Sequence, residues 1–282
     1  MMECELQLIA CEKGDFGMGK PNGIITLTTD FGNSDGFVGA MKGVILSINP
    51  NAQLVDIAHD IPHHDVRSAA WVLAGAFKYF PTGTVHLAVV DPGVGSNRKG
   101  LMAETQHGLF ILPDNGLLSM VVKRDPLIRA HSLDNPQYQL PVKSNTFHGR
   151  DIFAPAAAHA SLGVPVPSFG QSVDSLVEQH WPSWRKHAGQ FFGNILSFDA
   201  YGNAITNLPN HLVATETWRC SVGGYSLLGP IRSYADAEIG KPLFLPGSMD
   251  LLEIAVREGS ARDRLELALG MEVTLEKIKT PL

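Results

Sequence analysis

Apolar residues in the first half of the chain alternate between a spacing typical of strands and one typical of helices. The apolar run Ile24–Thr29 predicts a buried strand that ends at Asp30. Apolar residues then recur at helical spacing from Phe37 to Ile48, until Asn-Pro-Asn stops the helix. Further strands are expected at 53–58, 84–90 and 109–112, and helices at 65–79 and 151–162. This pattern predicts an α/β fold, with an N-terminal α/β/α domain over residues 23–182 and a largely parallel sheet.

The pattern changes after about His180. The segment Trp181–Gly189 is polar and contains a Pro, which is typical of a linker. Beyond it the apolar runs are short and are broken by Gly, Pro and Asn, with strands expected at 191–198, 204–207, 218–222, 241–245, 251–256 and 265–275. Short, repeated strands predict a smaller, all-β C-terminal domain over residues 190–282, either a barrel-like fold or a sandwich.

Composition narrows the range of partners. The 282-residue chain is 44% hydrophobic and 18% charged, as expected of a globular protein. Its net charge of -6 argues against a nucleic-acid partner, and no apolar run approaches the ~20 residues of a membrane span. Three cysteines do not form a disulfide framework, so we expect a cytoplasmic protein. Residues 1–22 are expected to be an extension, because the stretch before Cys11 lacks the basic residues of a signal peptide.

Four loop segments carry side chains suited to chemistry. They are T-T-D-F-G-N-S-D at 28–35, D-P-G-V-G-S-N-R at 91–98, F-H-G-R-D at 147–151, and D-A-Y-G-N at 199–203 with P-G-S-M-D at 246–250. Each also has a purely structural interpretation, because Asp-Pro-Gly is common turn chemistry and Asp30 or Asp151 suits a helix cap. Asp30 and Asp91, however, follow strands, where open α/β sheets bind their ligands.

Nucleotide and metal motifs receive little support. Gly93-Val94-Gly95 lacks the third Gly of the dinucleotide fingerprint, and no Gly-Lys-Ser/Thr phosphate loop occurs. The His-rich run His59–Asp65 contains side chains that bind zinc or iron in other proteins. It lacks the spacing of known ligand sets, contains a Pro and precedes a helix that Asp65 can cap. We expect no metal, and a metal-dependent hydrolase that uses this loop is kept as an alternative.

Together, these segments resemble the S-adenosylmethionine hydroxide adenosyltransferases, relatives of the 5′-fluorinase and 5′-chlorinase. The resemblance runs from about Gly23 to the C-terminus and rests on the order of T-T-D-F-G, D-P-G-V-G-x-x-R, P-D-N-G, F-H-G-R-D-I-F-A-P and Y-G-N. It implies cleavage of S-adenosylmethionine to adenosine and methionine, by attack of water or hydroxide on C5′, without a cofactor. It also implies a homotrimer, with the site between the α/β domain of one subunit and the β domain of its neighbour.

The resemblance assigns roles to individual residues. The family's catalytic Asp, Arg and His match Asp91, Arg98 and His148. Its substrate contacts match Asp30 for the ribose, Asp35 for the methionine amino group, Asp199 and Asn203 around the aromatic-Gly pair, Tyr201 for the adenine ring and Ser248 for the methionine carboxylate. The halogenating relatives have an Arg where this chain has Met249, so the second partner of that carboxylate stays open.

The matched residue types suit the reaction. A carboxylate and an imidazole can share the proton that water loses, and a guanidinium can stabilise the developing hydroxide. Attack of hydroxide on a sulfonium compound annihilates charge, which a dry pocket favours. The sequence leaves open which group takes the proton. It also leaves two alternative functions, a 5′-halogenase and a non-catalytic protein that binds an adenosyl ligand. The halogenases lack the D-P-G-V-G segment, which favours water as the nucleophile here.

Overall fold

The computed structural model describes residues 21–213 and 216–278. The predicted extension of residues 1–22 lies outside these ranges, apart from its last two residues. The chain divides into two compact units at Gln179 and His180, and each unit has its own apolar core. In the described part of the chain, no helix has both the length and the apolar composition needed to cross a membrane.

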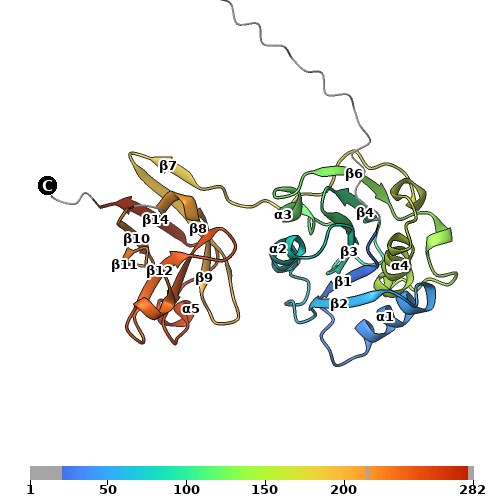
Figure 1. Cartoon of the computed structure of the whole chain (residues 1–282), viewed down its shortest axis with the longest axis horizontal. Coiled ribbons are helices and arrows are strands. Elements are labelled where there is room, and N and C mark those ends of the chain that lie inside the picture. Colours follow the sequence, from blue (N-terminus) through green and yellow to red (C-terminus); the bar gives the residue numbers. More distant parts are fainter. Residues whose placement is uncertain (1–20, 214–215, 279–282) are drawn as a thin grey trace, which may run out of the picture. The chain divides into compact units, whose positions relative to one another are not determined.

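The N-terminal unit is built on a six-stranded sheet with the order β2-β1-β3-β5-β4-β6 (Figure 1). β2, β1, β3 and β5 pair in parallel, whereas β4 is antiparallel to both of its neighbours, so the predicted, largely parallel sheet is confirmed. The strands are β1 (Ile24–Thr29), β2 (Gln53–Ala58), β3 (Thr84–Val89), β4 (Gly100–Thr105), β5 (Gly108–Pro113) and β6 (Leu127–Ser132). The sequence pattern missed β4 and β6.

Helices cover both faces of this sheet (Figure 1). α1 and α4 pack with Ile25 and Leu27 of β1 in one core, and α2 packs on the opposite face. The Asp65 carboxylate accepts a hydrogen bond from the Ser68 N–H at 3.0 Å, which confirms the predicted cap of α2. The helices are α1 (Phe37–Ile48), α2 (Val66–Ala76), η1 (Phe77–Tyr79), α3 (Ser119–Val122), η2 (Pro136–Tyr138), the π-helix η3 (Gly149–Phe153), α4 (Ala154–Ser161) and η4 (Val166–Phe169).

The C-terminal unit is an antiparallel sheet with the order β11-β10-β14-β8-β9-β13-β12, and β7 pairs with β8. The Ile231 N–H, just after β11, donates to the Phe244 carbonyl in β12, so the two ends of the sheet meet in a nearly closed barrel. The barrel-like prediction is thereby confirmed. The elements are β7 (Arg185–His187), β8 (Gln190–Phe198), β9 (Ala204–Pro209), η5 (Asn210–Val213), β10 (Trp218–Val222), β11 (Tyr225–Gly229), η6 (Tyr234–Asp236), β12 (Pro242–Pro246), β13 (Leu251–Val256), α5 (Ala261–Arg264) and β14 (Glu272–Lys277).

Two expectations for this unit were wrong. The supposed linker contains strand β7, and its Trp181 is 6% exposed, so part of it belongs to the folded unit. The strand expected at 265–275 begins only at Glu272. Leu265 and Leu267 lie in the turn before it and are buried in the barrel core, which produced the alternation that the sequence pattern took for a strand.

Candidate functional site

Asp91, Arg98 and His148 form one hydrogen-bonded group in the N-terminal unit. The Arg98 Nε donates to the Asp91 Oδ2 at 2.8 Å, and the Arg98 Nη2 donates to the same oxygen and to the His148 Nδ1, the latter at 2.9 Å. The side chains of Asp91 and Arg98 are only 5% and 11% exposed. The structure therefore places a carboxylate, a guanidinium and an imidazole in direct contact, although 50 residues separate Arg98 from His148.

The tight loop that follows β3 explains why Asp91 and Arg98 meet. The Gly93 N–H donates to the Asp91 Oδ1 at 3.2 Å, and the Ser96 hydroxyl donates to the Gly93 carbonyl at 2.7 Å. Gly95 has a φ of 77°, and a Cβ there would lie 2.6 Å from the Asn145 carbonyl oxygen. Only glycine fits that conformation and that approach. The Asp-Pro-Gly segment therefore forms a turn, as its residue types predict. The same turn also places the Asp91 carboxylate beside Arg98.

The tautomer of His148 follows from its partner. Because a guanidinium can only donate, the His148 Nδ1 must accept, and its proton is assigned to Nε2. Burial and the Arg98 charge lower the pKa of His148, and the charges of Asp91 and Asp151 oppose this shift only partly. The ring is therefore neutral at pH 7. The Arg98 guanidinium also lies 5.0 Å from the centre of the Phe153 ring, within the range of a cation–π contact.

Asp151 of the F-H-G-R-D motif stabilises the local fold through hydrogen bonds. It lies within η3 and is fully buried, so it does not cap the helix that begins there. Its carboxylate accepts hydrogen bonds from Arg150 at 2.6 Å and from the Ser144 N–H at 2.7 Å. Although burial opposes it, these two hydrogen bonds lower the pKa of Asp151. The residue fastens the preceding loop to η3 and so fixes the start of the helix at His148.

The His-rich run holds Asp30 in place at the end of β1. Asp30 is 7% exposed, and its Oδ2 accepts a hydrogen bond from the His64 N–H at 2.9 Å. The His63 Nδ1 lies 2.9 Å from the Asp30 carbonyl oxygen, and His59 contacts Thr29 through Nδ1 at 2.8 Å. These rings and amides face β1. Across residues 21–213 and 216–278, no group of three or more His, Cys, Asp or Glu is arranged to hold a metal ion.

Asp35 lies apart from these contacts. It is exposed on the loop between β1 and α1, just before Gly36, which has a φ of 71°. Its carboxylate stands in solvent, where a ligand could reach it. Beside the trio of Asp91, Arg98 and His148 lies a cavity of about 280 Å³ that both Arg98 and His148 line, together with Ser132, Gln171 and neighbouring residues.

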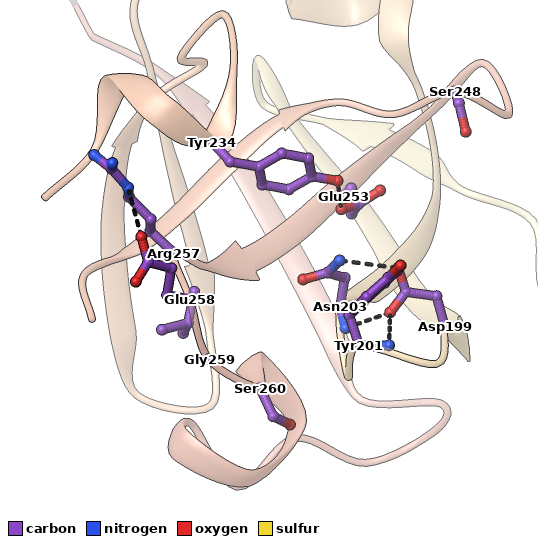
Figure 2. Close-up of a pocket in the computed structure, with 11 residues that line it drawn as sticks. Asp199, Tyr201, Asn203, Tyr234, Ser248, Glu253, Arg257, Glu258, Gly259 and Ser260 are labelled. Atoms are coloured by element: carbon purple, nitrogen blue, oxygen red, sulfur yellow. Dashed lines mark hydrogen bonds and ion pairs between the residues drawn. The ribbon is translucent and has the colours of Figure 1, made fainter. Parts of the chain in front are cut away.

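Four predicted substrate contacts line one cavity of about 660 Å³ in the C-terminal unit (Figure 2). They are Asp199, Tyr201, Asn203 and Ser248. Asp199 organises the turn between β8 and β9: its Oδ1 accepts from the N–H groups of Tyr201 and Asn203, and its Oδ2 accepts from the Asn203 Nδ2. This turn leaves Tyr201 79% exposed, with its ring free to meet a flat ligand.

Sequence reasoning missed other residues of this cavity. They are Tyr234, Glu253, Val256, Arg257, Glu258, Gly259 and Ser260. Glu253 carried a usable signal, because it is a single charged residue within the apolar run of β13 and a buried charge needs a partner.

The predicted site residues fall into two groups. The trio, Asp30 and Asp35 belong to the N-terminal unit, and the other four belong to the C-terminal unit.

Comparison with known proteins finds matches to both units of the chain. Residues 25–170 match the family model "SAM hydroxide adenosyltransferase N-terminal domain", and residues 193–274 match the model of the C-terminal domain. The chain belongs to this family.

An (R)-S-adenosyl-L-methionine hydrolase from Thermus thermophilus is 39% identical to this family member, over 88% of this chain and 97% of the relative. A fluorinase from an Actinoplanes species is 26% identical over 91% of this chain and 98% of its own length. Among solved structures, an uncharacterized conserved protein from Thermotoga maritima superposes with a TM-score of 0.84 at 34% identity, covering 89% of this chain and 99% of that protein. These relatives therefore match the chain over both of its units.

Proposed function

We propose that this chain hydrolyses S-adenosylmethionine to adenosine and methionine. The observation that carries the proposal is the hydrogen-bonded group of Asp91, Arg98 and His148, in which the side chains of Asp91 and Arg98 are 5% and 11% exposed. Family membership supports the substrate, because the matching family model is that of S-adenosylmethionine hydroxide adenosyltransferases. The products need no cofactor, since water supplies the oxygen atom and the sulfonium is its own leaving group.

The contacts support a division of labour within the trio. Water attacks C5′ in line, the new C5′–O bond forms as the C5′–S bond breaks, and the sulfur keeps the electron pair in the neutral thioether of methionine. The water proton goes to Asp91 in this proposal, because the Nδ1 lone pair of His148 already accepts from Arg98. The Arg98 guanidinium stabilises the developing hydroxide, and the Nε2–H of neutral His148 is left to orient the water.

The remaining residues bind substrate in this proposal. Asp30 binds the ribose hydroxyls and Asp35 the methionine amino group, Tyr201 stacks on adenine, and Asp199, Asn203 and Ser248 complete the C-terminal contacts. The two groups of residues belong to different units, which fits the trimer of the family resemblance, with one subunit's N-terminal unit facing a neighbour's C-terminal unit. We further propose a cytoplasmic location, since a chain with three cysteines carries no disulfide framework.

Isotope labelling tests the reaction. Incubation of S-adenosylmethionine with the protein in oxygen-18 water should place one labelled oxygen in the 5′-hydroxyl of adenosine, measured by mass spectrometry. Unlabelled adenosine, or no adenosine at all, would refute the proposal, and the second result would favour a binding protein. Parallel reactions with chloride or fluoride test the halogenase alternative through 5′-haloadenosine. Activity lost with a chelator and restored by a metal would favour the metal-dependent alternative.

A further inference from the structure

The P-D-N-G segment, residues 113–116, has no role in the proposed reaction, yet it lies beside the loop that carries Asp91 and Arg98. It begins at the last residue of β5 and forms the turn that follows. β3 and β5 run parallel, so their carboxyl ends lie at the same edge of the sheet, and the antiparallel β4 begins at that edge. The turn therefore stands next to both ends of the 91–98 loop, which connects β3 with β4.

A side-chain hydrogen bond holds the start of this loop. The pairing of β3 with β5 ends at Leu87 and Ile111, so Val90 lies beyond this ladder. The Asn115 Nδ2 donates to the Val90 carbonyl oxygen at 2.8 Å. Val90 is fully buried and directly precedes Asp91, and a buried carbonyl needs a donor. The Asn115 side chain thus continues the work of the ladder and fixes the peptide from which Asp91 extends.

A backbone hydrogen bond from the neighbouring residue holds the end of the loop. The Asp114 N–H donates to the Lys99 carbonyl oxygen at 2.9 Å, and Lys99 directly follows Arg98. Two adjacent residues of one turn, Asp114 and Asn115, therefore hold both ends of the loop. Asp91 and Arg98 are its first and last residues, so they stand next to these fixed points.

The turn presents the Asn115 amide group in one orientation. The Asn115 Oδ1 accepts from the Leu117 N–H at 3.3 Å, so both polar atoms of the side chain are engaged. Exchanging its oxygen and nitrogen would match neither partner, which settles the assignment. Gly116 has a φ of 92°, and a Cβ there would lie 2.6 Å from the Gln179 Cγ, so this conformation requires glycine. The donor of Asn115 is thereby directed at the 91–98 loop.

We infer that Asn115 is a positioning residue for the hydrolysis of S-adenosylmethionine, which acts through the Val90 peptide to hold Asp91 against Arg98. This inference rests on the proposed function. Removal of a proton from water depends on where the Asp91 carboxylate stands, and a displacement of about 1 Å can lower a rate about 100-fold. Because Asn115 acts through the backbone of the loop, its loss should affect turnover and leave the substrate contacts in place.

Steady-state kinetics on the full chain test the inference. Asn115→Ala removes both hydrogen bonds of the side chain, whereas Asn115→Asp keeps the acceptor for Leu117 and loses the donor for Val90. We expect both variants to lower kcat about 10- to 100-fold, with KM within about twofold. Adenosine release measures both constants. Full activity of Asn115→Asp would overturn the inference, and so would a rise in KM with unchanged kcat.

Asn22→Ala is the matched control. Asn22 lies at the opposite edge of the same sheet, just before β1, where its Nδ2 donates to the Pro81 carbonyl and its Oδ1 accepts from the Ile24 N–H. This is the bonding pattern of Asn115, away from the 91–98 loop. We expect Asn22→Ala to keep kcat within about twofold, with thermal unfolding as the check on stability. Equal losses of kcat in the two alanine variants would overturn the inference in favour of a general loss of stability.

Hydrogen exchange of the Arg98 Nε proton, followed by NMR, separates the inference from the proposed function. This proton is donated to the Asp91 Oδ2 at 2.8 Å. Asn115→Ala should speed its exchange about five- to tenfold, as expected when one supporting hydrogen bond is lost, and Asn22→Ala should leave it unchanged. Unchanged exchange in Asn115→Ala would overturn the inference. If the wild-type chain released no adenosine, the proposed function would fail, and the exchange rate would still decide whether Asn115 holds the loop.

Discussion

Polar side chains are arranged differently in the two units. In the N-terminal unit, Asp91, Arg98 and His148 satisfy one another through short hydrogen bonds. In the C-terminal unit, Tyr201 is exposed and Glu253 faces an open cavity of about 660 Å³. Reactive groups gain from a rigid, preassembled arrangement, because no reorganisation is then needed during the reaction. Recognition groups gain from leaving acceptors and ring faces free for the ligand.

This contrast predicts that changes in the N-terminal unit act on turnover. Asp91→Ala removes the proposed proton acceptor and leaves Arg98 without its carboxylate. We expect kcat to fall by about 10²- to 10⁴-fold, the usual contribution of acid–base catalysis, with KM changed little. Steady-state release of adenosine measures both constants. Asp91→Asn is the matched variant, because it retains a hydrogen-bond acceptor for Arg98 without the charge. Undiminished turnover in both variants would contradict the assignment.

Acid should act through His148. Its folded-state pKa is lowered below the ordinary 6.5, so the ring stays neutral at pH 6.5 and becomes charged only at lower pH. Protonation puts a hydrogen on Nδ1 and breaks the bond from Arg98. We therefore expect kcat/KM to hold at pH 6.5 and to decline below it. His148→Gln should lower kcat about 10²-fold and remove this decline of kcat/KM at acid pH. A decline that begins above pH 6.5, or one that persists in the variant, would argue against this role.

Changes in the C-terminal unit should act on substrate binding. Tyr201→Ala removes the exposed ring, and base–aromatic stacking is worth about 1–3 kcal/mol, so we expect KM to rise roughly 5- to 100-fold. The value of kcat should stay within about threefold, because Tyr201 and the trio belong to different units. Tyr201→Phe, which keeps the ring, serves as the control and should behave like the wild type. A fall in kcat as large as that of Asp91→Ala would contradict the assignment of turnover to the N-terminal unit and of substrate binding to the C-terminal unit.

The smallest expected effect concerns stability. Burial and the nearby His107 lower the pKa of His86 to about 3, against about 6.5 in an unfolded chain. Between these values the unfolded state binds the additional proton, so the N-terminal unit loses stability as the pH falls below 6.5, by up to about 1.4 kcal/mol per pH unit. Hydrogen exchange at pH 7 and pH 5 should show this loss in the N-terminal unit. His86→Gln should reduce the pH dependence there and leave the C-terminal unit unaffected.

Local pattern was sufficient for some elements and not for others. β1, β2 and α1 were predicted at their observed bounds because apolar period and the Asn-Pro-Asn stop are local signals. β4, β6, β7 and β11 were missed. β6 exposes three of its six residues and β7 exposes all three of its residues, so neither shows a clear apolar pattern, and both depend on pairing with another strand. The β7 residues Arg185, Lys186 and His187 look like a linker until β8 supplies their hydrogen bonds.

By itself, the sequence determined the α/β and barrel-like architecture, the motif residues and, through its resemblance, the family. It did so because strand and helix periods, turn residues and short motifs are properties of neighbouring positions. Only the tertiary structure decided that His148 accepts from Arg98, that the His-rich run holds Asp30, and that Glu253 meets Tyr234 across a cavity. Each of these facts joins residues that lie 19 or more positions apart in the chain, and such contacts exist only once the backbone is folded.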